Sequence, residues 1–423
     1  MPARPSSLIP RLRGKPADQV LDQALTGGLA AAMAMVPDPR RSAGRRFGLA
    51  PVLLVAALAV TCDADSFTAI HQWACDLPEA LKARLGLPRC ALTGRHTVPS
   101  EKRIRTLIAR VDPAALLEAV GRYACHRLER AGMPKIPEHV AAEREARRRA
   151  KAARNQTPPP RRVLAADGKT LRGSGRTRHQ RTHLVAFVDQ HSGRVDTRIN
   201  VPGKTNETPA LRAHVESIEL DETVLTADAA HTCRATAQAI IDAGGHYLLI
   251  VKRNTPRLFG AIAEILLTGL DAAEVGEHHS WSERGHGRIT RRVLRAASAC
   301  GIDFPGAKQV MMTMRHRRPI DQGGRESRQI VYAITSLEPE SAGPADLAVI
   351  QQRHWAGEAR HHILDVTFAE DHCQARSGHA PENLSTLRDL AIDTFRAAGH
   401  VNLAHARRHH THQPERAFDL YEL

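Results

Sequence analysis

The chain has 423 residues, with 60 Lys and Arg against 45 Asp and Glu, which gives a formal net charge of +15. This length allows two or three domains with a sizeable core, and the 42% hydrophobic fraction excludes a largely disordered chain. The charge favours a polyanionic partner such as nucleic acid. The longest apolar run, residues 49–60, is too short to span a bilayer and predicts a buried helix without a membrane anchor.

Seven cysteines are scattered along the chain, and no two of them form a CxxC pair. This usage disfavours a disulfide framework or a zinc ribbon and is typical of a reducing cytoplasm. We therefore expect a cytoplasmic protein with free thiols.

The first 162 residues read as three segments. Residues 1–40 are expected to form a basic arm, and residues 41–138 a helical domain, because apolar residues recur at spacings of three and four, as in Ile104, Leu107 and Ile108. Residues 139–162 are rich in Ala and Arg and end in three prolines, which predicts a charged helix and a stiff linker. That segment either contacts a phosphate backbone or is a solvated connector.

From residue 163 the apolar pattern changes to that of strands alternating with helices. Three strand-like runs separated by short polar connections come first, and helices and strands alternate after them, which predicts a mixed sheet with helices on its faces. The strand-like runs lie at 163–167, 183–189, 194–201, 223–228 and 246–252. Residues 255–340 predict a β-rich insertion, and a helix over 344–366 follows it. Residues 401–423 are polar and predict a fraying tail.

Three acidic residues far apart in the chain stand in short polar signatures. Asp167 and Asp228 each follow an apolar strand-like run, and Glu358 lies in the predicted helix 344–366. Residues at strand ends of such sheets face a crevice where ligands bind. Carboxylate oxygens suit Mg²⁺ or Mn²⁺, and a pair of such ions cuts and joins phosphodiesters. Gly357, beside Glu358, costs about 1 kcal/mol of helix propensity.

Other acids and aromatic residues leave alternatives open. Asp365, Glu370 and Asp371 follow Glu358 and one of them could replace it as the third ligand. Trp355 is one helical turn from Glu358, where it either packs in the core or stacks on a base. Clustered histidines such as those at 409–412 have no cysteine partners at finger spacing, so a zinc site is not expected.

Several strings, in the same order and spacing, resemble the insertion-sequence transposases of the DDE class, and most closely their H-repeat-associated group. They are DGKTLRGS, KTNET, TADAAHT, GHYLLIVKRN, GHGRITRR and RHWAGE. The helical segment before them also resembles the domain that precedes the catalytic core in that group. The similarity covers about residues 25–400.

The resemblance implies a fold, a cofactor and a set of site residues. It implies a ribonuclease-H-like α/β catalytic domain over 163–400, with the β-rich insertion at about 255–340, behind an all-α N-terminal domain. Asp167, Asp228 and Glu358 would be the acids that bind two Mg²⁺ or Mn²⁺ ions. The residues expected to contact DNA are Lys169, Arg172, Lys204, Asn206, Lys252, Asn254, Arg353 and His354.

The expected function is DNA transposition, by which the protein binds the terminal inverted repeats of its element, frees a 3′ hydroxyl and joins it to target double-stranded DNA. Because two ends must be brought together, a homodimer is expected in the complex. Two alternatives stay open: a catalytically weakened DNA-binding regulator, and a nuclease that cuts but never joins.

Overall fold

The computed structural model describes residues 28–41, 45–131, 162–177, 180–201, 207–268, 278–285, 287–320 and 325–423. The predicted linker and most of the predicted basic arm lie outside these ranges, as do Lys204 and Asn206. No helix in the described ranges is both long and apolar enough to cross a membrane.

The elements described before residue 132 are helices that surround one apolar helix. They are α2 (Gly28–Ala34), α3 (Leu49–Thr61), α4 (Phe67–Asp76), α5 (Glu79–Arg84), α6 (Glu101–Ile108) and α7 (Pro113–Ala131). Helix α3 is the apolar run of the sequence, and its residues from Val52 to Thr61 are buried, which confirms the predicted buried helix. Helix α2 also buries Leu29 and Met33, so the packed region begins before residue 41.

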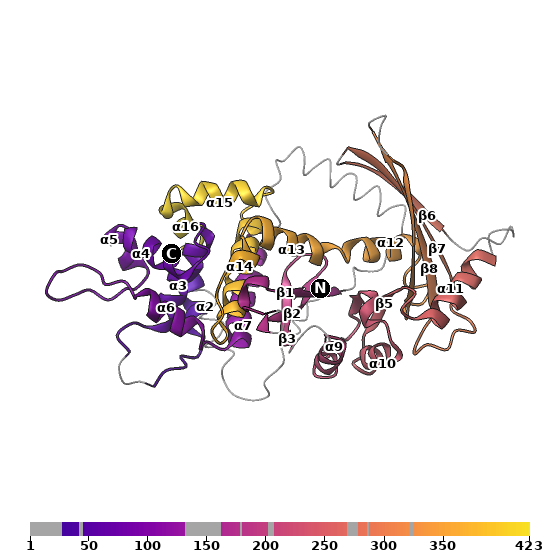
Figure 1. The fold of residues 1–423 in the computed structure, drawn as a ribbon, viewed down its shortest axis with the longest axis horizontal. Coiled ribbons are helices and arrows are strands. Elements are labelled where there is room, and N and C mark those ends of the chain that lie inside the picture. The colour runs from indigo at the N-terminus through magenta and orange to yellow at the C-terminus, as the bar shows by residue number, and fades with distance from the viewer. Residues whose placement is uncertain are drawn as a thin grey trace.

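The C-terminal segment belongs to the same helical core. Helices α14 (Ala380–Ala397), α15 (Leu403–Thr411) and α16 (Pro414–Leu420) pack against α3, and Figure 1 shows them beside the N-terminal helices. The prediction of a fraying tail over 401–423 was wrong. Phe418 and Tyr421 are buried, and the Tyr421 hydroxyl lies 2.8 Å from the Thr61 hydroxyl. This contact across 360 residues of sequence separation cannot be read from local polarity.

The strands β1 to β9 form one mixed sheet in the order β3-β2-β1-β4-β5-β9-β8-β7-β6. Strand β1 pairs in parallel with β4 and antiparallel with β2, and β4 pairs in parallel with β5. The bounds are β1 (Val163–Thr170), β2 (His183–Asp189), β3 (Val195–Val201), β4 (Val224–Ala227), β5 (His246–Val251), β6 (His278–Gly285), β7 (Arg288–Ser298), β8 (Gln309–Pro319) and β9 (Ser327–Thr335). The predicted insertion is thus β-rich, and it extends the central sheet because β9 pairs with β5.

Helices cover both faces of this sheet. Helices α9 (Glu207–Val215), α10 (Arg234–Asp242) and α11 (Pro256–Thr268) bury one face, and α12 (Pro344–Arg353) covers the other. Helix α13 (Ala356–Val366) continues from α12 and contacts β1 and β2. In Figure 1, α12 and α13 run between the helical end of the molecule and the β6–β8 end. The single helix predicted over 344–366 is therefore two helices that meet at His354 and Trp355.

Candidate functional site

Two of the three predicted acids lie at neighbouring positions of the sheet. Ala166 of β1 is paired in parallel with Ala227 of β4, and Asp167 and Asp228 are the residues that follow them. Because side chains alternate along strands, both carboxylates lie on the same face, which α12 and α13 cover. Asp167 does not end β1 as expected, since β1 pairs with β2 as far as Thr170. The strand that ends here is β4, and Asp228 begins the short turn η4 (Ala229–His231).

The third acid lies on the helix above this pair. Gly357 of α13 faces Asp167 so closely that a Cβ atom added to it would lie 3.3 Å from the Asp167 Cβ. This close approach explains a glycine in the first turn of a helix despite its poor propensity. Glu358 comes next, and its side chain is exposed. In the described part of the chain, no group of three or more His, Cys, Asp or Glu has the arrangement of a metal site.

An imidazole accompanies each aspartate. His361 Nδ1 lies 3.2 Å from the Asp167 carboxylate, and His354 Nε2 lies 3.7 Å from that of Asp228. The nearby His354 imidazole holds the pKa of Asp228 below its ordinary value, against the opposing effect of partial burial. The other ring nitrogen of His354 lies 2.8 Å from the Thr226 hydroxyl. His354 is thus buried, with one ring nitrogen beside Thr226 and the other facing Asp228. This burial disfavours the DNA contact that was predicted for it.

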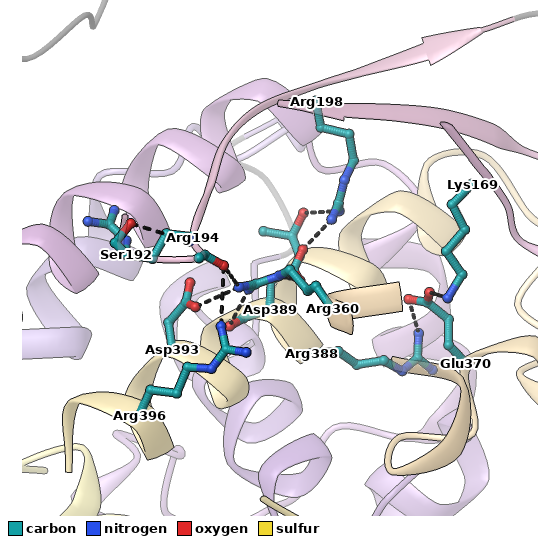
Figure 2. A network of polar contacts seen from close by, with 12 residues as sticks. Lys169, Ser192, Arg194, Arg198, Arg360, Glu370, Arg388, Asp389, Asp393 and Arg396 are labelled. Atoms are coloured by element: carbon teal, nitrogen blue, oxygen red, sulfur yellow. Dashed lines mark hydrogen bonds and ion pairs between the residues drawn. The ribbon is translucent and has the colours of Figure 1, made fainter. Parts of the chain in front are cut away.

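Lys169, the predicted phosphate ligand two residues after Asp167, forms ion pairs with side chains of this chain. Lys169 Nζ lies 2.6 Å from Asp365 and 2.7 Å from Glu370. Glu370 is fully buried and is also paired with Arg388, as Figure 2 shows. Burial alone would raise the pKa of Glu370, but these two cations outweigh it and hold the pKa low. Lys169 therefore links β1 to α13, and the carboxylates of Asp365 and Glu370 are occupied by it.

The other predicted DNA contacts that the structure describes differ in their exposure and in their partners. Arg172 is exposed and pairs with Asp371 at 3.2 Å, and Lys252 is exposed and near enough to lower the pKa of Asp228. The amide of Asn254 donates to the Ala229 carbonyl at 2.7 Å, so it orders the turn after Asp228. Arg353 is exposed at the end of α12. These DNA-binding roles stay predictions.

Helix α13 is fixed by a buried arginine three residues from its contact with Asp167 (Figure 2). Arg360 donates to Asp389 at 2.7 Å, to Asp393 at 2.9 Å and to the Gly193 carbonyl at 2.5 Å. Burial alone would lower the pKa of Arg360, but the two carboxylates outweigh it and raise the pKa. This network joins α13 to α14 and to the β2–β3 turn, so it holds the first turn of α13 over the sheet.

A basic surface continues from the site across the insertion. Arg288 and Arg292 of β7 and Arg315 and Arg317 of β8 lie on one side of the sheet, and we call these four residues the arginine face. The same side carries Leu294, which packs in one cluster with Val224 of β4, so it is also the side of the aspartates. Partial burial and the neighbouring arginines lower the pKa of Arg315 to about 10.

Two tryptophans lie along the arginine face. The guanidinium of Arg315 lies 4.9 Å from the ring centre of Trp355, and that of Arg292 lies 5.9 Å from Trp281. Trp355 is 47% exposed, so it does not pack in the core, which was one of the two roles considered for it. Since Trp355 directly precedes α13, it connects the arginine face to the helix that covers Asp167.

Two site residues, Glu207 and His231, were not singled out from the sequence, and they lie inside the KTNET and TADAAHT strings. His361 was considered only as one of the clustered histidines, for which a zinc site was not expected. The sequence around Glu207 and His231 is a short polar string without periodicity, which does not indicate a site. Only the fold shows that α9 begins beside η4.

Comparisons with known proteins agree on a family. Residues 158–392 match the model of the transposase DDE domain, and residues 30–124 match that of the DDE_Tnp_1-associated domain. "Putative transposase YncI" of Escherichia coli O157:H7 is 28% identical over 55% of this chain and 62% of its own length. "H repeat-associated putative transposase YhhI" of Escherichia coli K12 is 30% identical over 55% of this chain and 63% of its own length.

This chain thus spans just over three fifths of the length of these curated relatives. A piggyBac transposase from a synaptic complex with hairpin DNA aligns to 95% of this chain and 77% of its own, with 13% identity and a TM-score of 0.38. A TM-score of this size does not establish a common fold. The family model, which covers more than half of the residues, does show that this chain belongs to the DDE-domain transposases.

Proposed function

We propose that this protein is a DNA transposase in which Asp167, Asp228 and Glu358 form the metal-binding acids. The observation that carries the proposal is the parallel register of β1 and β4, which sets Asp167 and Asp228 side by side on one face. The order β3-β2-β1-β4-β5, with only β2 antiparallel to its neighbours, supports a ribonuclease-H-like type for this part of the sheet. Membership of the DDE-domain family supports the reaction.

The donor chemistry at these positions suits two Mg²⁺ or Mn²⁺ ions. Asp167 and Asp228 offer hard oxygen ligands, and the Asp228 carboxylate is 54% exposed and therefore accessible to a hydrated ion. Glu358 would complete the set, since its exposed side chain follows the residue that packs on Asp167. When bound, such ions activate the attacking oxygen and stabilise the leaving 3′ oxygen of a phosphodiester.

The arginine face would hold the phosphate backbone of DNA beside these acids. Arg292 and Arg315 are directly opposite each other on paired strands, an arrangement in which like charges are destabilising. A bound polyanion removes that repulsion, and arginine forks match phosphate oxygens. The N-terminal helices would bind the terminal inverted repeats, and a homodimer would bring two ends together.

The function is tested by cleavage of DNA that carries the terminal inverted repeats flanking the gene. Asp167→Asn, Asp228→Asn and Glu358→Gln should each slow Mg²⁺-dependent nicking at least about 10²-fold. The dissociation constant for DNA should stay unchanged. Asp303→Asn is the matched control because Asp303 is 92% exposed in the β7–β8 connection, where it pairs with Arg234 of α10, the helix on the sheet face opposite to α12. Normal cleavage by the Asp228→Asn protein would refute the assignment.

One observation favours a second function, a DNA-binding regulator without catalysis. The three acids are not gathered into a metal-site arrangement in the described residues. The regulator would bind the inverted repeats but leave them intact in Mg²⁺ and in Mn²⁺. Joined products with a paired-end substrate would separate a transposase from a nuclease that only cuts.

A further inference from the structure

Glu207 is a carboxylate that lies beside Gly168, which follows Asp167, and beside the ring of His231, which closes the turn after Asp228. It is the first residue of α9, and its side chain is only 14% exposed. Its two oxygens face different histidines: one pairs with His183 of β2, and the other lies 3.6 Å from His231 Nε2. Both imidazoles are buried, so Glu207 is enclosed between the sheet and the turn that follows Asp228.

The first contact of Glu207 is with the residue after Asp167. A Cβ atom built on Gly168 would lie 3.0 Å from the carboxyl carbon of Glu207 and 3.0 Å from each of its oxygens. Real Cβ atoms rarely approach another group this closely, so any side chain at this position pushes against the carboxylate. The glycine of the DGKT string and the glutamate of the KTNET string are therefore a matched pair.

The second contact fixes the turn after Asp228. His231 closes η4 with a hydrogen bond from its backbone N–H to the Asp228 carbonyl at 2.9 Å. Its ring is held on both sides, because Nδ1 lies 3.1 Å from the Thr208 hydroxyl and Nε2 faces Glu207. The Thr208 hydroxyl also donates to the Ala230 carbonyl at 3.2 Å. The first two residues of α9 thus hold the turn that carries Asp228.

We propose that Glu207 is a positioning residue of the acid site, which fixes Asp167 through Gly168 and Asp228 through His231. This inference rests on the proposed function, since it assumes that the two aspartates bind the catalytic ions. Ligands of a metal are commonly oriented by groups behind them, and loss of such a group costs about 10- to 100-fold in affinity. Glu207 itself touches neither the ions nor the DNA.

The direct test measures Mn²⁺ binding to the full-length protein by electron paramagnetic resonance, without DNA. Glu207→Ala should weaken Mn²⁺ binding about 10- to 100-fold, and Glu207→Gln should weaken it less because the amide keeps the shape of the carboxylate. Glu216→Ala, at an exposed position in the turn directly after the same helix, is the matched control and should bind normally. Unchanged Mn²⁺ affinity in a folded Glu207→Ala protein would overturn the inference.

A double-mutant cycle separates positioning from general stability. Gly168→Ala should weaken Mn²⁺ binding in the wild type, because its methyl group displaces the Glu207 carboxylate. In the Glu207→Ala background the methyl group has room, so Gly168→Ala should weaken binding little further. Equal effects of Gly168→Ala in both backgrounds would contradict the matched pair, even if each variant were less stable.

The same binding assay distinguishes the inference from the function on which it rests. If Asp167→Asn and Asp228→Asn leave Mn²⁺ binding unchanged, the proposed acid site fails. If they abolish binding while the Glu207 and Gly168 variants bind normally, only the positioning role fails.

Discussion

Buried ion pairs hold the parts of this site at fixed positions. Asp389 is 2% exposed and lies between Arg360 of α13 and Arg198 of β3. Burial alone would raise the pKa of Asp389, but the two guanidinium groups outweigh it and lower the pKa. A carboxylate whose pKa is lowered on folding stabilises the protein above its unfolded pKa and loses that effect as pH falls through its folded pKa.

Replacing this carboxylate should therefore destabilise the protein in a pH-dependent way. Asp389→Asn leaves Arg360 and Arg198 incompletely paired in the interior, which should cost about 3–5 kcal/mol of unfolding free energy at pH 7. The gap to the wild type should start to narrow as pH falls below about 4, near the unfolded pKa of an aspartate, and should go on narrowing toward the lower folded pKa. Urea denaturation between pH 7 and 3 measures this, with exposed Asp303→Asn as control. A gap that is constant with pH would contradict the assignment.

The residues show which parts of the site a sequence can specify. Asp167 and Asp228 were predicted because each follows an apolar strand, and parallel pairing then fixes their proximity. Glu358 was predicted to join them, but its side chain is exposed, and it is Gly357 and His361 of the same helix that lie against Asp167. Lys169 was predicted as a phosphate ligand, yet its partners Asp365 and Glu370 lie on a segment much later in the chain. Such pairings depend on tertiary packing, which no local pattern contains.

Among the helices and strands, the segments with a periodic apolar pattern could be predicted, but the elements they pack or pair with could not. The strands at 163–170 and 246–251 show the apolar runs expected of a covered sheet. The pairing of β9 with β5, which joins the insertion to the sheet, leaves no signal in either strand. Residues 403–420 form two helices although they are rich in His and Arg, since a few apolar residues such as Phe418 suffice to anchor them.

Across the whole molecule, part of the net charge of +15 is gathered on one side of the sheet, in the arginine face. The arginine face lies on the same side as the two aspartates, and Trp355 lies between them at the start of α13. A polyanion laid along this side would reach the acids without leaving the protein surface. The composition predicted a polyanionic partner, and this side of the sheet is where we propose that it binds.

DNA binding should therefore depend on this side of the insertion in a salt-dependent manner. Replacement of Arg288, Arg292 and Arg317 by Gln should weaken binding and flatten the slope of log K against log salt by about 0.9 for each phosphate that the protein no longer neutralises. The matched control replaces Arg291, Arg318 and Arg328, which are exposed on the opposite side of β7, β8 and the neighbouring β9. Equal changes in both triple variants would contradict a DNA path on the side of the aspartates.

Anomalous diffraction from crystals soaked in Mn²⁺ would show whether Asp167 and Asp228 share a divalent cation. We expect a peak within bonding distance of both carboxylates, and none at this place in the Asp228→Asn protein. Mn²⁺ bound elsewhere, with no density between these two side chains in a protein that cleaves DNA, would contradict this expectation.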